Sequence, residues 1–412
     1  MKLLVKNAGA LLTAASSGKP KIGIEMEDLG IIKNGAVLVE NGVIVDVGKT
    51  EDFRDVQVDE VVDAKGRVVM PGFVDAHTHL IFAGTREKEV TLKIQGLSYM
   101  EILKQGMGIL STVRRTREES MEALVADGVS RVREMLEHGT TTLEAKSGYG
   151  LEKNTEIKIL KAIKRTAEET GLDIVPTFLG AHAVPPEFLG AGDKYVEKVI
   201  RMLPDVKEHA KFCDVFCEKG VFEIEQSRAI LEAAGKMGFA LKIHADEFTQ
   251  LGGAELAAAL HATSADHLLM AGERGLAAMR DAGTIAVLLP ATPFTSFVNS
   301  YPDARKMIAL GLPVALATDF NPNAYCMSMQ FVLSLAVYKM KMLPAEAINA
   351  ATINAAFAIG MGERVGSIER GKQADMLVLD VQNHEQIPYF IARNNVALVI
   401  KKGKVVVRRG VR

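Results

Sequence analysis

Histidine and carboxylate side chains recur in this sequence at the ends of short apolar segments. His77 and His79 directly follow the segment 68–75. Residues two positions apart in a strand point to the same side, so these two imidazoles form half of a chelate. Imidazole is a natural ligand for zinc and iron. An isolated His-x-His pair is more often a surface pair beside a turn, but here further ligand types follow later apolar segments.

His244 and Asp319 are the most informative of these later residues. Asp319 ends the apolar segment 313–318, where a carboxylate must be paired, hydrogen-bonded or metal-bound. His244 and His267, each taken alone, could equally be core histidines. Residues from separate segments can act together only if the ends of those segments meet. We therefore expect a metal site made of His77, His79, His244 and Asp319.

The middle of the chain contains the elements that would bring these ends together. Helix-like stretches alternate there with eight apolar segments, at 68–75, 140–145, 173–179, 213–217, 240–244, 264–268, 284–289 and 313–318. Eight such units predict an α/β fold with a closed (β/α)8 TIM-like barrel, whose active site lies at the carboxyl ends of the strands. A doubly wound open sheet is the structural alternative.

The two ends of the chain resemble each other more than they resemble the middle. Both carry short β-rich runs, and Asn41-Gly42 is a strong signal for a tight hairpin turn. We expect a small β-sandwich domain formed from both ends. The predicted division is 1–63 and 363–412 for this domain and 64–362 for the barrel.

Composition excludes several classes of function. Lys and Arg total 49 and Asp and Glu total 51, so no charge excess suggests nucleic acid or an anionic membrane as a partner. The apolar runs are too short to span a bilayer, and the amino-terminal residues do not form a signal peptide. The three cysteines suggest no disulfide framework. We expect a cytoplasmic protein with a small-molecule substrate.

The segment 71–79, Pro-Gly-Phe-Val-Asp-Ala-His-Thr-His, resembles the signature of the amidohydrolase superfamily. This resemblance implies that the two histidines, a histidine on the fifth strand and an aspartate on the eighth hold a metal. Within the superfamily the chain is similar, nearly end to end, to the branch that opens an imidazolone ring in histidine degradation. The motifs that carry this similarity lie at 80–86, 108–114, 144–150, 178–185, 216–220, 244–247, 264–267 and 317–322.

The resemblance implies hydrolysis of a C–N bond of 4-imidazolone-5-propanoate, giving N-formimidoyl-L-glutamate, with one zinc or iron ion per chain and a homodimer. A metal at this site would make a water acidic enough to react near neutral pH. Asp319 and His267 would accept its proton, and attack is expected at the ring carbon between the two nitrogens. Glu247 would protonate the leaving nitrogen, or else orient His244. His182 would bind the ring carbonyl, or else belong to the core.

The substrate's propanoate needs a cation, and Arg can bind a carboxylate through two hydrogen bonds. The resemblance assigns this role to Arg86, with Tyr149 and Tyr99 beside it. Asn321, Asn323 and Ala324 should also contact the substrate. Here the chain departs from the family, which usually has Gly and a small hydroxyl residue at 323 and 324. Asn tolerates left-handed backbone, but Ala324 offers no hydroxyl.

Two other functions remain open. The chain could be another enzyme of the same fold, either a deaminase of a heterocyclic amine or a cyclic-amide hydrolase. It could also be a non-catalytic scaffold, although all four expected ligands are present. Lys219, near the end of the fourth strand, leaves open a binuclear centre bridged by a modified lysine.

Overall fold

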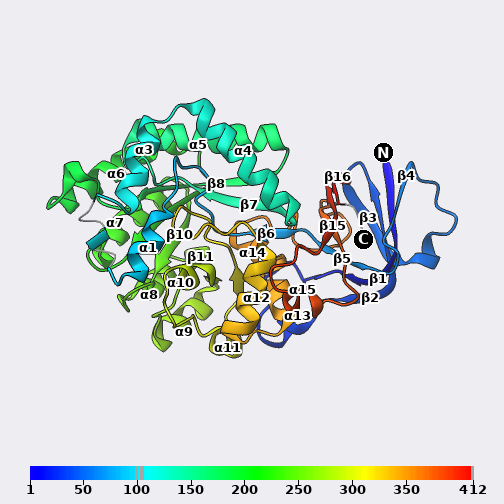
Figure 1. The fold of residues 1–412 in the computed structure, drawn as a ribbon. Coiled ribbons are helices and arrows are strands. Elements are labelled where there is room, and N and C mark those ends of the chain that lie inside the picture. Colours follow the sequence, from blue (N-terminus) through cyan, green and yellow to red (C-terminus); the bar gives the residue numbers. More distant parts are fainter. Residues whose placement is uncertain (98–100, 103–105, 410–412) are drawn as a thin grey trace.

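The computed structural model describes residues 1–97, 101–102 and 106–409, which form a barrel and a separate sheet built from both chain ends. In Figure 1 the blue and red strands of the two termini lie side by side, away from the helices that surround the barrel. Each part has its own apolar core. The cluster in the end sheet includes Leu3, Val37 and Met376, all of which are buried.

The barrel has eight parallel strands, which confirms the expected fold and strand count. A parallel bridge between Thr78 and Phe320 joins the ends of its first and last strands, so the sheet closes and the open-sheet alternative is wrong. The strands are β6 (Phe73–Asp75), β7 (Thr140–Lys146), β8 (Asp173–Ala181), β9 (Phe212–Cys217), β10 (Ala240–Ala245), β11 (Ser264–His267), β12 (Ile285–Leu288) and β13 (Val314–Leu316).

Helices follow the barrel strands, and the helix-like stretches expected from the sequence at 155–170, 193–203, 225–237, 253–260, 273–281 and 304–310 correspond to α5–α9 and α11. The helices between β6 and β7 and those after β13 were not expected. The helices are α1 (Lys88–Ile94), α3 (Ile109–Glu118), α4 (Met121–Glu137), α5 (Lys153–Thr170), α6 (Gly192–Val206), α7 (Ile224–Lys236), α8 (Gly253–Ala259), α9 (Glu273–Ala282), α10 (Ala291–Thr295), α11 (Ala304–Ala309), α12 (Met329–Met340), α13 (Pro344–Ala350), α14 (Ile353–Ala358) and α15 (Gln386–Tyr389), with short 3-10 turns η1 (Gly23–Glu27), η2 (Thr50–Phe53) and η3 (Pro186–Phe188).

The end sheet is mixed, with strand order β16-β15-β14-β5-β1-β2-β3 and β4 paired to β1. Asn41 and Gly42, with φ of 50° and 84°, form the expected hairpin turn between β2 and β3. The strands are β1 (Lys2–Leu12), β2 (Ile31–Glu40), β3 (Val43–Lys49), β4 (Glu60–Asp63), β5 (Val68–Pro71), β14 (Met376–Leu379), β15 (Val396–Lys401) and β16 (Lys404–Arg408).

The segment 68–75, expected as one barrel strand, is divided between the two sheets. β5 pairs with β1 and β14 in the end sheet, whereas β6 pairs with β7 in the barrel. Gly72 lies at the division, and a Cβ there would come within 2.2 Å of Thr141 Oγ1. The close approach of the chain to β7 therefore requires glycine. The division of the chain at 63 and 363 stays a prediction.

In the part of the chain that the structure describes, no helix combines the length and the apolar character needed to cross a membrane.

Candidate metal centre and active site

A cavity of about 540 Å³ lies at the carboxyl ends of the barrel strands. Of the residues that the sequence predicted for the site, those that line it are His79, Arg86, Tyr149, His182, His244, Glu247, His267, Asp319, Asn321 and Asn323. His77 is fully buried behind them. Ala324 is buried and is not part of the cavity wall, and Tyr99 falls outside the described residues.

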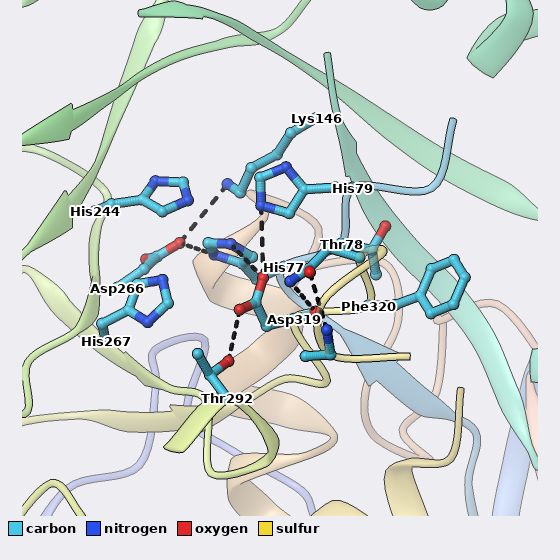
Figure 2. Close-up of polar contacts among 12 residues, drawn as sticks. His77, Thr78, His79, Lys146, His244, Asp266, His267, Thr292, Asp319 and Phe320 are labelled. Carbon is cyan, nitrogen blue, oxygen red and sulfur yellow. Dashed lines mark hydrogen bonds and ion pairs between the residues drawn. The ribbon is translucent and has the colours of Figure 1, made fainter. Parts of the chain in front are cut away.

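His77, His79 and Asp319 converge because the first and last barrel strands meet. The backbone N–H of His79 donates to the carbonyl of Phe320 at 2.8 Å, and that of Asp319 donates to the carbonyl of His77 at 3.1 Å. The Nε2 atoms of both histidines lie 3.5 Å from Asp319 Oδ1 (Figure 2). These ligand atoms all lie within 4.8 Å of one another, which suits a shared metal ion.

His244 joins this group through His77. The ligand atoms of His77, His244 and His267 form a second set within 4.8 Å. The Nε2 atoms of His77 and His244 are buried, and in the described part of the chain neither has a hydrogen-bond partner. Buried polar atoms normally have hydrogen-bond partners, so two unpartnered nitrogen atoms in a group of ligand atoms within 4.8 Å of one another fit a bound metal ion. The donor set of imidazoles and one carboxylate suits zinc or iron.

Two carboxylates that sequence reasoning did not assign to the site determine how these imidazoles face it. His77 Nδ1 lies 2.6 Å from Asp266 Oδ2, and His244 Nδ1 lies 3.1 Å from Asp214 Oδ1. An ionised carboxylate only accepts hydrogen bonds, so each Nδ1 carries the proton and each Nε2 presents its lone pair. A carboxylate behind a ligating histidine is a common way to orient it.

Asp319 is held in an unusual conformation at the end of β13. Its φ is 50°, a left-handed value that is uncommon for residues other than glycine. Thr292 Oγ1, on α10, donates to Asp319 Oδ2 at 2.5 Å. Burial raises the pKa of Asp319 to about 6, against the lowering effect of this hydrogen bond. Sequence reasoning missed Thr292, and no feature of its sequence neighbourhood singles it out.

Glu247 and His267 lie together on the cavity wall, with Glu247 Oε2 3.6 Å from His267 Nε2. Burial, and then the nearby Asp319 and Glu218, raise the pKa of Glu247 well above its ordinary value. A glutamate whose pKa is raised in this way is suited to act as a general acid.

His182 stacks on His79, with ring centroids 4.8 Å apart and an interplanar angle of 15°. Its Nδ1 donates to the carbonyl of Gly148 at 3.0 Å. Burial lowers the pKa of His182 to about 3, so the ring is neutral. The bond to Gly148 leaves Nε2 as the other polar atom of the ring.

Arg86 lines the cavity, and its side chain is 8% exposed. Its Nε and Nη2 donate to the two carboxylate oxygens of Glu89, at 2.9 and 2.7 Å. Glu89 also accepts the backbone N–H of Gly108 at 2.7 Å, which ties the arginine to the loop before α3. The structure therefore places Arg86 in a rigid setting and not on the solvated surface.

The turn after β13 is built around Asn321. Its side-chain oxygen accepts the backbone N–H groups of Asn323 and Ala324, at 2.7 and 3.0 Å. Asn323 is not among the residues with positive φ, so the turn does not use the tolerance of Asn for left-handed backbone at this position. Lys93 Nζ donates to Asn323 Oδ1 at 2.5 Å, which connects this turn to α1.

Two more buried carboxylates shape the loops that form the cavity wall. Glu156 accepts the N–H groups of Gly148, Gly150 and Leu151, on either side of Tyr149. Glu218 accepts those of Phe248 and Thr249, directly after Glu247. Glu218 belongs to the motif 216–220, whereas Glu156 lies outside every quoted motif, and neither role was predicted. Lys219, which was considered as a bridging ligand, is exposed at the cavity wall.

Comparison with known proteins agrees with this geometry. The model of the amidohydrolase family matches residues 68–406. The chain is 49% identical over 413 residues to the imidazolonepropionase of Alkaliphilus oremlandii, covering 98% of both chains. It is 50% identical to that of Geobacillus kaustophilus, covering 99% of this chain and 98% of the relative.

Among solved structures, guanine deaminase of E. coli has a TM-score of 0.77 over 100% of both chains, at 14% sequence identity. This likeness concerns the fold alone, whereas the two bacterial relatives match nearly the whole sequence. The chain therefore belongs to the amidohydrolase family and, within it, to the family of the imidazolonepropionases.

Proposed function

We propose that this enzyme hydrolyses 4-imidazolone-5-propanoate to N-formimidoyl-L-glutamate, a step in the degradation of histidine to glutamate. The relatives named imidazolonepropionase, at 49% and 50% identity over nearly the full length, support this activity. The geometric observation that carries it is one cavity lined both by metal-ligand side chains, such as His79 and Asp319, and by the buried Arg86. A ring-opening hydrolase for a substrate with a carboxylate tail needs both.

The atom balance of this reaction identifies the bond that breaks. The product keeps the formimidoyl carbon between two nitrogens and gains a new carboxylate. Water must therefore add to the ring carbonyl carbon, and the bond from that carbon to the neighbouring nitrogen must break. Attack at the carbon between the two nitrogens, as expected from the sequence, would leave a carboxamide and a formyl group instead.

His77, His79, His244 and Asp319 would hold the metal in this proposal. The chemistry that a metal supplies at such a centre is activation of water and polarisation of a carbonyl. Asp319 and His267 would take up the proton released by the attacking water. Thr292 donates to one oxygen of Asp319, which leaves its other oxygen toward the histidines.

Glu247 would carry a proton to the leaving ring nitrogen. Its raised pKa, caused mainly by burial, supports a protonated side chain at the start of the reaction. His182 would donate from Nε2 only in another tautomer, because its Nδ1 contacts the carbonyl of Gly148. In the tautomer that the Gly148 carbonyl selects, with Nδ1 protonated, Nε2 would instead accept a hydrogen bond from a ring N–H of the substrate.

Arg86 would bind the propanoate, and its fixed pairing with Glu89 would present the guanidinium without further ordering. Tyr149 would complete this end of the cavity. Contacts from Tyr99, Asn321 and Asn323 belong to the same proposal. A direct contact from Ala324 has less support, because this residue is not part of the cavity wall.

The remaining expectations concern the state of the enzyme in the cell. We propose one zinc or iron ion per chain, a homodimer and a cytoplasmic location. Metal analysis of the purified protein tests the first of these, and two ions per chain would contradict it. Sedimentation would test the dimer.

An assay with metal-loaded protein and imidazolonepropanoate tests the activity. We expect the ultraviolet absorbance of the substrate to fall while formiminoglutamate appears in equal amount. Ammonia release without ring opening would instead identify a deaminase. Absence of turnover by protein with one metal per chain would refute the assignment.

A further inference from the structure

Behind the ligand atoms, the barrel interior contains a cluster of charged side chains that are fully buried. The cluster consists of Glu144 and Lys146 on β7, Asp214 on β9, Lys242 on β10 and Asp266 on β11. Burying charges is costly unless each is paired and hydrogen-bonded. A buried charged cluster directly behind the metal ligands is therefore expected to have a function at the metal site.

We propose that Lys146 is a positioning residue for the metal centre, which holds Asp214 and Asp266 so that His244 and His77 present Nε2 to the metal. This proposal rests on the metal centre of the proposed function, but not on the identity of the substrate. Figure 2 shows Lys146 beside Asp266, with His77 and His244 around them.

The contacts of Lys146 connect two strands that lie apart in the sequence. Its Nζ donates to Asp214 Oδ2 at 2.7 Å and to Glu144 Oε1 at 2.8 Å, and lies 3.7 Å from Asp266 Oδ2. The backbone N–H of Lys146 donates to the carbonyl of Thr78, between the two histidines of the first strand. The lysine is thus fixed relative to His77 by its main chain and relative to both aspartates by its side chain.

Asp214 uses its two oxygens for two different donors. Oδ2 accepts from Lys146, and Oδ1 accepts from His244 Nδ1 at 3.1 Å. Asp266 is similar, since Oδ1 accepts from Ser264 at 2.6 Å while Oδ2 contacts His77 Nδ1. One ammonium group therefore lies within 4 Å of both carboxylates that orient two ligands from different strands.

Lys242 provides a matched comparison within the same cluster. It is also fully buried and lies 3.8 Å from Asp266 Oδ2, but its Nζ donates to the carbonyls of Ala76 and Ala358. The ion pairs of the described residues include none between Lys242 and Asp214. Loss of either lysine removes a buried charge, yet only Lys146 reaches the aspartate behind His244.

The test compares Lys146→Met with Lys242→Met, using metal binding without substrate. We expect Lys146→Met to weaken Zn²⁺ binding, measured by chelator competition, by about 10- to 100-fold, which is typical for groups behind metal ligands. We expect a smaller change for Lys242→Met. The visible absorption of the Co²⁺-loaded protein should change in Lys146→Met, because the coordination geometry changes.

Asp214→Asn keeps the test decisive if Lys146→Met does not fold. An amide replaces one of the two carboxylate oxygens with an NH₂ donor, so only one of the two positions that face Lys146 and His244 still accepts. We expect weaker Zn²⁺ binding, and in the Lys146→Met/Asp214→Asn double variant a loss smaller than the product of the two single losses.

Some results would overturn the proposal. These are a folded Lys146→Met protein with wild-type Zn²⁺ affinity and Co²⁺ spectrum, equal losses in the two lysine variants, independent effects in the double variant, or a wild-type protein that binds neither metal. A wild-type protein that binds Zn²⁺ but does not act on imidazolonepropanoate would refute the proposed substrate and leave this inference standing.

Discussion

Arg86 illustrates how one side chain depends on its neighbours at the cavity. Its sequence position alone does not distinguish it from a solvated surface arginine. In the structure it is buried and paired through two hydrogen bonds with Glu89. A guanidinium held in this way loses little conformational freedom when it binds a carboxylate.

Replacing Arg86 with alanine should therefore weaken substrate binding. Hydrogen bonds to charged groups contribute about 1.5–3 kcal/mol, so we expect KM to rise roughly 10- to 100-fold. The metal content should not change, because Arg86 is not among the candidate ligands. Steady-state kinetics and metal analysis measure the two quantities. Lys88→Ala, an exposed charge two residues away, is the control; loss of metal in Arg86→Ala would contradict the role.

Buried carboxylates determine the shape of individual loops and elements around the site. Glu156, in the first turn of α5, accepts hydrogen bonds from three backbone N–H groups of the loop that carries Tyr149. Burial raises the pKa of Glu156, and the three N–H groups oppose this. The loop conformation therefore depends on one side chain from the following helix.

Glu156→Gln should disturb this loop, because an amide offers one acceptor oxygen for three donors. We expect a loss of about 1–3 kcal/mol in the free energy of unfolding and a lower kcat/KM, with metal content unchanged. Denaturant titration and kinetics are the measurements. Glu168→Gln, exposed on the same helix, should change neither. Unchanged stability and activity in Glu156→Gln would show that the loop holds its shape without these bonds.

The prediction of elements from the sequence succeeded where apolar segments alternate clearly with helices. All eight barrel strands were found this way. The division of 68–75 at Gly72 was missed, because a continuous apolar run carries no sign that its two halves pair with different sheets. The helices between β6 and β7, among them α3 and α4, were not predicted either.

An ionic cluster joins the barrel to the end sheet. Asp173, at the start of β8, accepts hydrogen bonds from Lys401 on β15 and from Gln373, both at 2.7 Å. Burial tends to raise the pKa of Asp173, but Lys401, Gln373 and Lys402 outweigh it and lower the pKa to about 2. The two parts of the molecule are thus coupled by a carboxylate that prefers its ionised form.

This coupling predicts a pH dependence of stability. The folded pKa is depressed from 3.8, so Asp173 contributes its full stabilisation above about pH 4 and loses it as the pH falls toward 2. Asp173→Asn should reduce the free energy of unfolding by about 1.5–3 kcal/mol at neutral pH. The difference from wild type should shrink as the pH falls below 4.

Denaturant titrations between pH 3 and 7 measure this dependence. Asp205→Asn is the control, since Asp205 forms an exposed pair with Lys153 that should contribute little. A constant difference between wild type and Asp173→Asn at all pH values would mean that ionisation of Asp173 does not couple the barrel to the sheet.

The sequence by itself determined the eight strand units, the β-rich character of both ends and the residue types of the metal centre, because strand periodicity and ligand chemistry are local properties. It also carried the resemblance that singled out Arg86, His182, Glu247 and His267. Only the structure shows that these four residues line the same cavity.

Only the tertiary structure determines which side chains form hydrogen bonds and ion pairs with the metal-binding histidines from behind. Asp214, Asp266 and Lys146 come from three strands, and no local pattern relates them. The left-handed conformations of His267 and Asp319, with φ of 78° and 50°, are likewise imposed by the surrounding packing. Contacts between distant segments depend on barrel closure, which sets the distance between side chains only after all eight strands have paired.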